Sequence, residues 1–245
     1  MPDGRMSVKV PYRVVGAYEK FEEEFRQAVE DADAQVSFPD VPLASCFTES
    51  GEAATVAFKR CLYLKDCPCR KLPRGKRLDV VVMALEKITR ASWALKSSTV
   101  YLNYFVVSNS EARLVQSLHY DFMEGGQPNH PFFHVQLTDE PIPEADLRGT
   151  GFDLELKLRD LSNECWVTTR IPTPDMTLAS VLYCLVADHL GAGIFRQFAE
   201  NVHSVQDRLP PPSFDALKKS LQGSMVHFKS SHWFAHMGKP AQQNS

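Results

Sequence analysis

Residues 99–171 hold a succession of short segments in which apolar and polar side chains alternate or β-branched and aromatic residues are concentrated, and this pattern constrains the fold more than any other feature of the chain. Alternation with a period of two is typical of strands that bury one face and expose the other. The most regular case is Phe152–Arg159, in which every second residue is apolar. Turn-forming residues separate the segments, so we expect an antiparallel meander of about five strands. The expected strands span residues 99–107, 113–122, 131–137, 152–159 and 165–171.

Helical periodicity flanks this meander on both sides. Apolar residues recur at helical spacing before it, and a capping threonine followed by proline and an acid indicates a helix start after it, at Thr173-Pro174-Asp175. Gly191 is expected to end that helix. The pattern therefore predicts helices over residues 17–32, 78–96, 174–190, 193–208 and 214–222, and one short additional strand over Thr55–Phe58.

A run of strands followed by a run of helices indicates the α+β class, with helices covering one face of an antiparallel sheet. We expect a single domain over residues 1–222 and a C-terminal tail over 223–245. Within the domain, residues 1–96 would form a helical part with a basic loop, 97–171 the sheet, and 172–222 a second helical part. This architecture leaves the other sheet face available for function.

The composition is that of an ordinary globular protein, with 44% hydrophobic and 23% charged residues and a net charge of −3. No apolar run approaches the roughly 18 residues that a membrane helix needs. The N-terminus lacks the apolar stretch of an export signal, and six cysteines without such a signal are most simply reduced thiols. We therefore expect a cytoplasmic protein that does not enter a membrane.

Histidines and an aspartate occupy matching positions on two neighbouring expected strands. If the strands pair, the polar face would bring together His119, Asp121, His134 and Gln136. Imidazole and carboxylate groups at this spacing suit acid–base catalysis, with the aspartate orienting a histidine. They equally suit a divalent metal, for which the candidate ligands are His119, Asp121, His130 and His134.

The same residues also fit a solvated polar face with no chemical role. The chain contains no zinc-protease helix motif, no nucleophile elbow and no phosphate-binding loop. The strand pair is therefore a candidate site without a reaction assigned to it.

The segment 59–77 carries eight basic residues and one acid, a net charge of +7 that leaves −10 for the rest of the chain. Two prolines and a glycine in this segment indicate a loop. Concentrated positive charge of this kind is typical of nucleic-acid or other polyanion binding, and the alternative is an ordinary solvated charge run. The candidate anion-binding residues are Lys59, Arg60, Lys65, Arg70, Lys71, Arg74, Lys76 and Arg77, together with Arg170 near the end of the expected sheet.

Four cysteines lie in or near the same segment: Cys46, Cys61, Cys67 and Cys69. Thiolates bind zinc tightly, and neighbouring cations favour the thiolate. Their spacing lacks the paired Cys-x₂-Cys pattern of structural zinc sites, so free thiols are the competing interpretation.

The order of motifs over residues 99–190 is similar to that of bacterial proteins of unassigned function, some of them encoded beside toxin–antitoxin or phage-defence genes. The resemblance rests on Tyr120-Asp121, on His130-Pro131-Phe132-Phe133-His134, and on Arg170-Ile171-Pro172 ahead of an apolar helix. It implies an α+β domain and a place in a stress or defence operon.

Two functions fit these observations. One is a binding or accessory module of a multi-component bacterial system, which docks a protein partner through the open sheet face and the basic loop. The other is a His/Asp-dependent hydrolase or nuclease, with or without a metal, whose basic loop brings in a nucleic-acid substrate.

Overall fold

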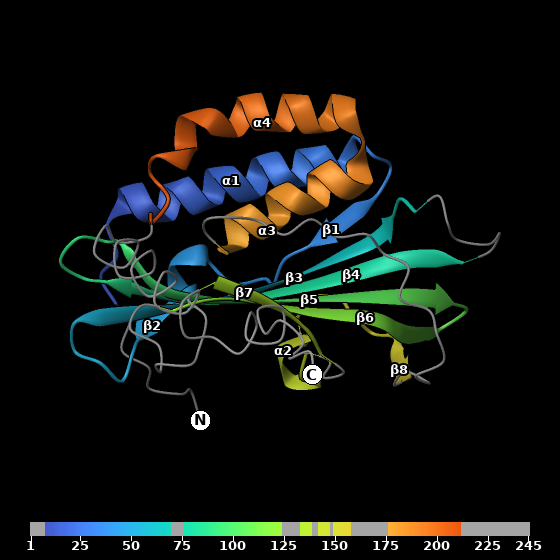
Figure 1. The fold of residues 1–245 in the computed structure, drawn as a ribbon, viewed down its shortest axis with the longest axis horizontal. Coiled ribbons are helices and arrows are strands. Elements are labelled where there is room, and N and C mark those ends of the chain that lie inside the picture. Colours follow the sequence, from blue (N-terminus) through green and yellow to red (C-terminus); the bar gives the residue numbers. More distant parts are fainter. Residues whose placement is uncertain are drawn as a thin grey trace, which may run out of the picture.

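A long, curled β-sheet with three helices stacked on one of its faces forms the body of the protein (Figure 1). The computed structural model describes residues 8–69, 76–123, 133–138, 142–147, 149–157 and 176–211. The helices are α1 (Tyr12–Glu30), α2 (Glu144–Leu147), α3 (Leu178–Leu185) and α4 (Ala192–Gln206), with a 3₁₀ turn at Leu43–Cys46 and a π turn at Val186–Leu190. The strands are β1 (Gln35–Ser37), β2 (Phe47–Glu49), β3 (Thr55–Cys67), β4 (Arg77–Thr89), β5 (Leu95–Ser108), β6 (Glu111–Met123), β7 (Phe133–Thr138) and β8 (Glu155–Lys157).

The α+β class is confirmed, but the sheet is larger than expected and is mixed. Six strands follow one another in the order β1-β3-β4-β5-β6-β7, and β2 adds to β3. These pairs are antiparallel, whereas β8 lies parallel to β6. The described part of the sheet therefore has eight strands instead of about five, and a parallel pair in place of a purely antiparallel meander.

The expected helix over 78–96 is wrong, because this segment forms strand β4 and the start of β5. Every residue from Leu78 to Ala84 is buried, since the sheet is covered on both faces here. Val80 and Val82 contact the helix-side core, and Val81 and Met83 belong to a smaller core on the other face. A continuous apolar run has no period of two, so it resembles a buried helix as much as a buried strand.

The three long helices lie where the sequence indicated, with shifted ends. The first runs from Tyr12 to Glu30 instead of 17–32, and it buries the expected aromatic residues, Tyr18 against Phe58 of β3 and the phenylalanines against Phe198 of α4. Thr177 caps α3, and its side chain accepts a hydrogen bond from the Ser180 N–H at 3.2 Å. Gly191, with φ of +98°, separates the π turn from α4. None of the described helices is long and apolar enough to cross a lipid bilayer.

Of the described residues of the expected strand 152–159, only 155–157 pair with the sheet. Phe152, Leu154 and Leu156 nevertheless pack into the smaller core, as the alternation predicted. Several expected elements lie outside the described residues: the strand over 165–171, the start of the helix at 173–175, the helix over 214–222 and the tail over 223–245.

Two buried polar links attach the helices to one face of the sheet. Arg60 of β3 forms a bidentate ion pair with Glu22 of α1, with both N–O distances at 2.8 Å. The carboxylate of Glu86 on β4 accepts hydrogen bonds from the Tyr18 hydroxyl of α1 at 2.6 Å and from the Leu178 N–H of α3 at 2.9 Å. Helices and sheet are thus joined by specific contacts as well as by apolar packing.

We expect Arg60→Ala to lower the free energy of unfolding by about 3–5 kcal/mol, because it leaves the Glu22 carboxylate buried without its partner. Replacing both partners, as in Glu22→Leu with Arg60→Met, should recover most of that loss. Urea unfolding followed by circular dichroism measures both effects. The control is Lys20→Ala, which removes only exposed ion pairs on α1 and should leave the unfolding midpoint nearly unchanged. Equal losses for Arg60→Ala and the double variant would contradict a buried pair.

Candidate functional site

His119 and Asp121 form a hydrogen-bonded pair on β6, on the sheet face opposite α1, α3 and α4. Residues i and i+2 of a strand point to the same side, and the distance from His119 Nε2 to Asp121 Oδ1 is 2.8 Å. Asp121 is 7% exposed, whereas the His119 side chain is 22% exposed. A mostly buried carboxylate that holds a half-exposed imidazole is the arrangement that fixes the orientation and tautomer of a histidine.

Strand β5 supplies a second layer of contacts to this pair. Tyr101 lies opposite His119 and Thr99 opposite Asp121. The Tyr101 and His119 rings stack with centroids 4.7 Å apart and an interplanar angle of 12°. The Thr99 hydroxyl donates to Asp121 Oδ1 at 2.7 Å. Asp121 is therefore oriented from two strands, and the imidazole is held flat against an aromatic ring.

The two candidate strands pair as predicted. In the antiparallel register of β6 and β7, Asp121 lies opposite His134 and His119 opposite Gln136. The side chains of His134 and Gln136 are outside the described part of the structure, as is all of His130. The complete four-residue acid–base set and the metal set therefore stay predictions, while His119 and Asp121 are brought together.

A groove of about 630 Å³ opens beside the His119–Asp121 pair. Its floor includes one row of residues across three strands, since Lys59, Leu85 and Thr99 are partners in the registers of β3, β4 and β5. Asp121 of β6 is the next member of the same row. Thr99 thus lines the groove and also holds Asp121, so the pair adjoins the groove directly.

Most of the described basic residues of segment 59–77 are engaged in ion pairs. The segment is not a loop over its whole length, because β3 continues to Cys67 and β4 begins at Arg77. Arg60 is buried under α1 with Glu22, so its predicted role in anion binding is wrong. Lys59 pairs with Asp146 of α2, and Arg77 lies 3.2 Å from the buried Asp79 carboxylate.

Four other candidate anion-binding residues, Arg70, Lys71, Arg74 and Arg170, lie outside the described residues. Lys76 is exposed, and Lys65 is half-buried on β3.

The four cysteines proposed for zinc do not come together. Among the described residues, no group of three or more histidine, cysteine or acidic side chains is placed to hold a metal ion. Cys61 belongs to the smaller core and Cys67 to the helix-side core, because a register shift between Leu64 and Cys67 turns the strand over. Burial raises the pKa of Cys61 to about 12 and that of Cys67 further still, which favours neutral thiols.

Comparison with protein-family models, curated proteins and solved structures returned no match. The geometry of the chain itself must therefore support any function.

Two features, one beside the candidate site and one on the helical side, were not recognised from the sequence. Thr99 and Tyr101 belong to the segment that its β-branched and aromatic residues identified as a strand, and a register between 99–107 and 113–122 would have revealed their contributions. No residue pattern in the sequence indicated the π turn after α3. It places His189 Nε2 3.2 Å from the Tyr104 hydroxyl, and burial lowers the pKa of this histidine.

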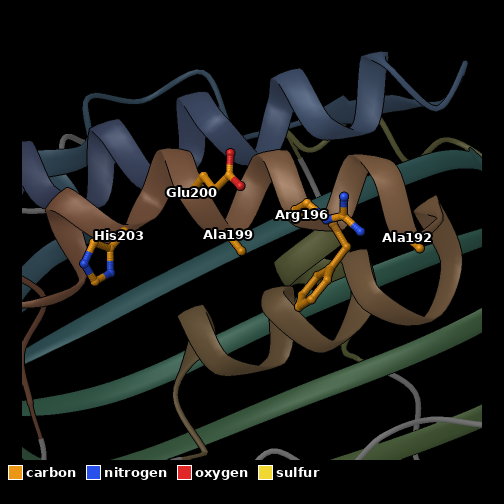
Figure 2. A pocket seen from close by; sticks show the side chains of 6 residues that line it. Ala192, Arg196, Ala199, Glu200 and His203 are labelled. Atoms are coloured by element: carbon orange, nitrogen blue, oxygen red, sulfur yellow. The ribbon is translucent and has the colours of Figure 1, made fainter.

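A second hollow of about 670 Å³ runs along α4, on the helical side of the molecule. Figure 2 shows Arg196, Glu200 and His203 along it, together with Ala192 and Ala199. These residues come from one helix and lie in the helical layer, away from the sheet face that carries His119. The hollow is thus separate from the candidate site.

We expect Cys61 and Cys67 to resist alkylation in the folded protein, because the thiolate is the reactive form and burial disfavours it. Iodoacetamide labelling read by peptide mass spectrometry should leave both thiols unmodified at pH 8.5. A pKa of about 12 leaves Cys61 almost entirely protonated at pH 10, so it should still label far more slowly there than an ordinary thiol with a pKa near 8.5, which is mostly ionised. Labelling of all cysteines in urea is the control. Rapid native labelling of Cys61 would contradict its burial.

The hydrogen bond to Asp121 predicts that neutral His119 carries its proton on Nε2. Long-range ¹H–¹⁵N correlation spectra report the tautomer of each histidine. Asp121→Asn should change the His119 ring signals, because a neutral amide no longer favours a proton at Nε2. Asp153→Asn, a matched change at an exposed position, should leave them unaltered. An Nδ1-protonated ring in the wild type would rule out this arrangement.

Proposed function

We propose that the protein is a binding module that docks a protein partner on the sheet face opposite α1, α3 and α4. The observation that carries this proposal is the groove beside the His119–Asp121 pair, which combines exposed apolar side chains with a fixed polar centre. A concave surface with apolar walls and a few oriented polar groups is typical of binding sites. His119 and Asp121 would then serve as interface residues that select the partner by hydrogen bonding.

The connection between β3 and β4 provides a second contact in this proposal. Residues 68–76 join two strands of the sheet and include Arg70, Lys71, Arg74 and Lys76, with no acidic residue among them. Such a basic connection suits a polyanion or an acidic patch on the partner. Its role is secondary, because the strand residues beside it are already paired with carboxylates.

The resemblance to bacterial proteins encoded beside toxin–antitoxin or phage-defence genes suggests the setting of this module. We propose that it is an accessory component of such an assembly and acts in the cytoplasm. The five cysteines of the described part are all free thiols, which is consistent with a reducing compartment.

The photocrosslinking amino acid benzoylphenylalanine, placed at Leu85 in the groove, should capture the partner in cells of the source organism. The matched control is the same amino acid at Tyr12, an aromatic position on α1 that is 86% exposed. We expect a light-dependent adduct of one defined mass at position 85 and none at 12. Excess wild-type protein should suppress the adduct, and excess Leu85→Lys protein should not. Equal adducts at both positions, or none at 85, would argue against docking on this face.

A His/Asp-dependent hydrolase or nuclease is the second candidate. The specific observation in its favour is that Asp121 is buried, bonded to Thr99 and aimed at an imidazole that is still partly exposed. A general base of this kind typically contributes about 10²–10⁴-fold to a rate. His134 and Gln136, opposite Asp121 and His119 in the register, would complete the set.

For this second candidate we expect about one divalent metal ion per chain by elemental analysis, lost in His119→Ala and in His134→Ala. His203→Ala, a histidine on the exposed side of α4, is the matched control and should keep the metal. A metal-free enzyme would instead show nucleic-acid hydrolysis that falls about 10²–10⁴-fold in Asp121→Asn. Metal-free protein without hydrolytic activity would leave only the binding function.

A further inference from the structure

Two of the three exposed large apolar side chains in the described part of the chain line one groove. These are Val41, which is 48% exposed, and Leu85, which is 36% exposed. The third, Tyr12, lies at the start of α1 on the helical side. Scattered exposed apolar residues are normal on a surface, but their meeting in a concave site indicates that an apolar group belongs there.

Two lysines flank the apolar centre of the groove. Lys59 is the partner of Leu85 in the β3–β4 register, and Lys87 is two residues further along β4 on the same face. Their carboxylate partners are Asp146 and Glu52, in ion pairs whose lysine side chains are about half exposed, at 50% and 49%. Exposed pairs of this kind contribute little stability, so a ligand carboxylate can replace the existing partner.

The balance of charge decides which class of partner fits. Asp146 and Glu52 pair with the two groove lysines, and Asp121 accepts a hydrogen bond from Thr99, so the lysines do not form a continuous positive surface. A nucleic acid, with a phosphate at every step, needs a continuous run of cations, which two separate lysines do not supply. A peptide with one or two carboxylates beside an apolar side chain matches two separate lysines around Leu85.

Hydroxyl groups complete the lining. Thr48, Ser97 and Thr99 supply donors and acceptors along the groove, which suit the backbone of an extended peptide. The volume of about 630 Å³ lies within the roughly 300–1,000 Å³ typical of ligand sites and accommodates a few side chains.

We propose that this groove binds an acidic peptide segment of the partner, with one apolar side chain against Leu85 and Val41 and carboxylates at Lys59 and Lys87. This inference rests on the proposed function and adds the chemistry of the docked segment. Because Thr99 also holds Asp121, the segment reaches the His119–Asp121 pair at one end of the groove.

The test is selection of a phage-displayed library of random 12-residue peptides on the full-length protein. Wild type should enrich peptides in which Asp or Glu flanks Leu, Ile, Val or Phe. Lys59→Glu with Lys87→Glu should abolish this enrichment or change it to Lys and Arg. The control, Lys9→Glu with Lys20→Glu, makes the same change of net charge at two exposed lysines that do not line the groove, and it should select the same acidic peptides as wild type.

Fluorescence polarisation of the best selected peptide gives the second measurement. Leu85→Lys should weaken its binding at least tenfold, while the Lys9/Lys20 variant binds it as wild type does. Selection of no consensus, a consensus without acidic residues, or unchanged binding to Leu85→Lys would overturn the inference. If crosslinking at position 85 still captures a cellular partner in any of those cases, docking on this face stands and only the acidic-peptide chemistry fails. If the acidic consensus appears but no partner is captured, the proposed function fails instead.

Discussion

The buried carboxylate of Glu86 joins two helices and two strands on the helix-covered face of the sheet. It lies on β4 and receives hydrogen bonds from α1, through the Tyr18 hydroxyl, and from the first turn of α3, through the Leu178 N–H. Ser98 on β5 donates to the same carboxylate at 3.4 Å. A buried carboxylate without these donors would be costly, so the helices and strands that satisfy it are held in one arrangement. Successive side chains of a strand point to opposite faces of the sheet. Leu85 and Lys87, which flank Glu86 on β4, therefore lie on the opposite face and line the groove.

Much of the site was predictable because it depends on local alternation. His119 and Asp121 are two residues apart on a strand with a clear period of two, and their common direction follows from the backbone alone. The pairing of β6 with β7 was also predictable, because residues 117–122 and 133–138 are close together in the sequence. The stacking of Tyr101 and the hydrogen bond from Thr99 required the register between β5 and β6, which a bulge between Tyr104 and Phe105 shifts. Bulges of this kind leave no reliable mark in the pattern of apolar residues.

The errors arose where partners are distant in the sequence. Segment 78–84 has no alternation because two different cores contact its two sides, and neither core is visible from the segment itself. Arg60 resembled a surface cation in a basic run, but its partner Glu22 lies 38 residues earlier on α1. The count of basic residues in segment 59–77 therefore predicted more exposed positive charge than its strand residues provide. The basic residues on β3 and β4 are paired with acidic residues from α1, from α2 and from the strands themselves.

Thr99 connects the groove with the polar pair, and this connection distinguishes the face from a passive docking surface. Its hydroxyl donates to Asp121, and Asp121 in turn orients His119. A ligand that engages the Thr99 hydroxyl from the groove competes for the same donor, and it would alter the hydrogen bonding of Asp121 and hence the position of the imidazole. Binding in the groove would therefore be coupled to the position of His119 through one side chain. A binding module uses such coupling for selectivity, whereas an enzyme uses it to align its base only when the groove is filled.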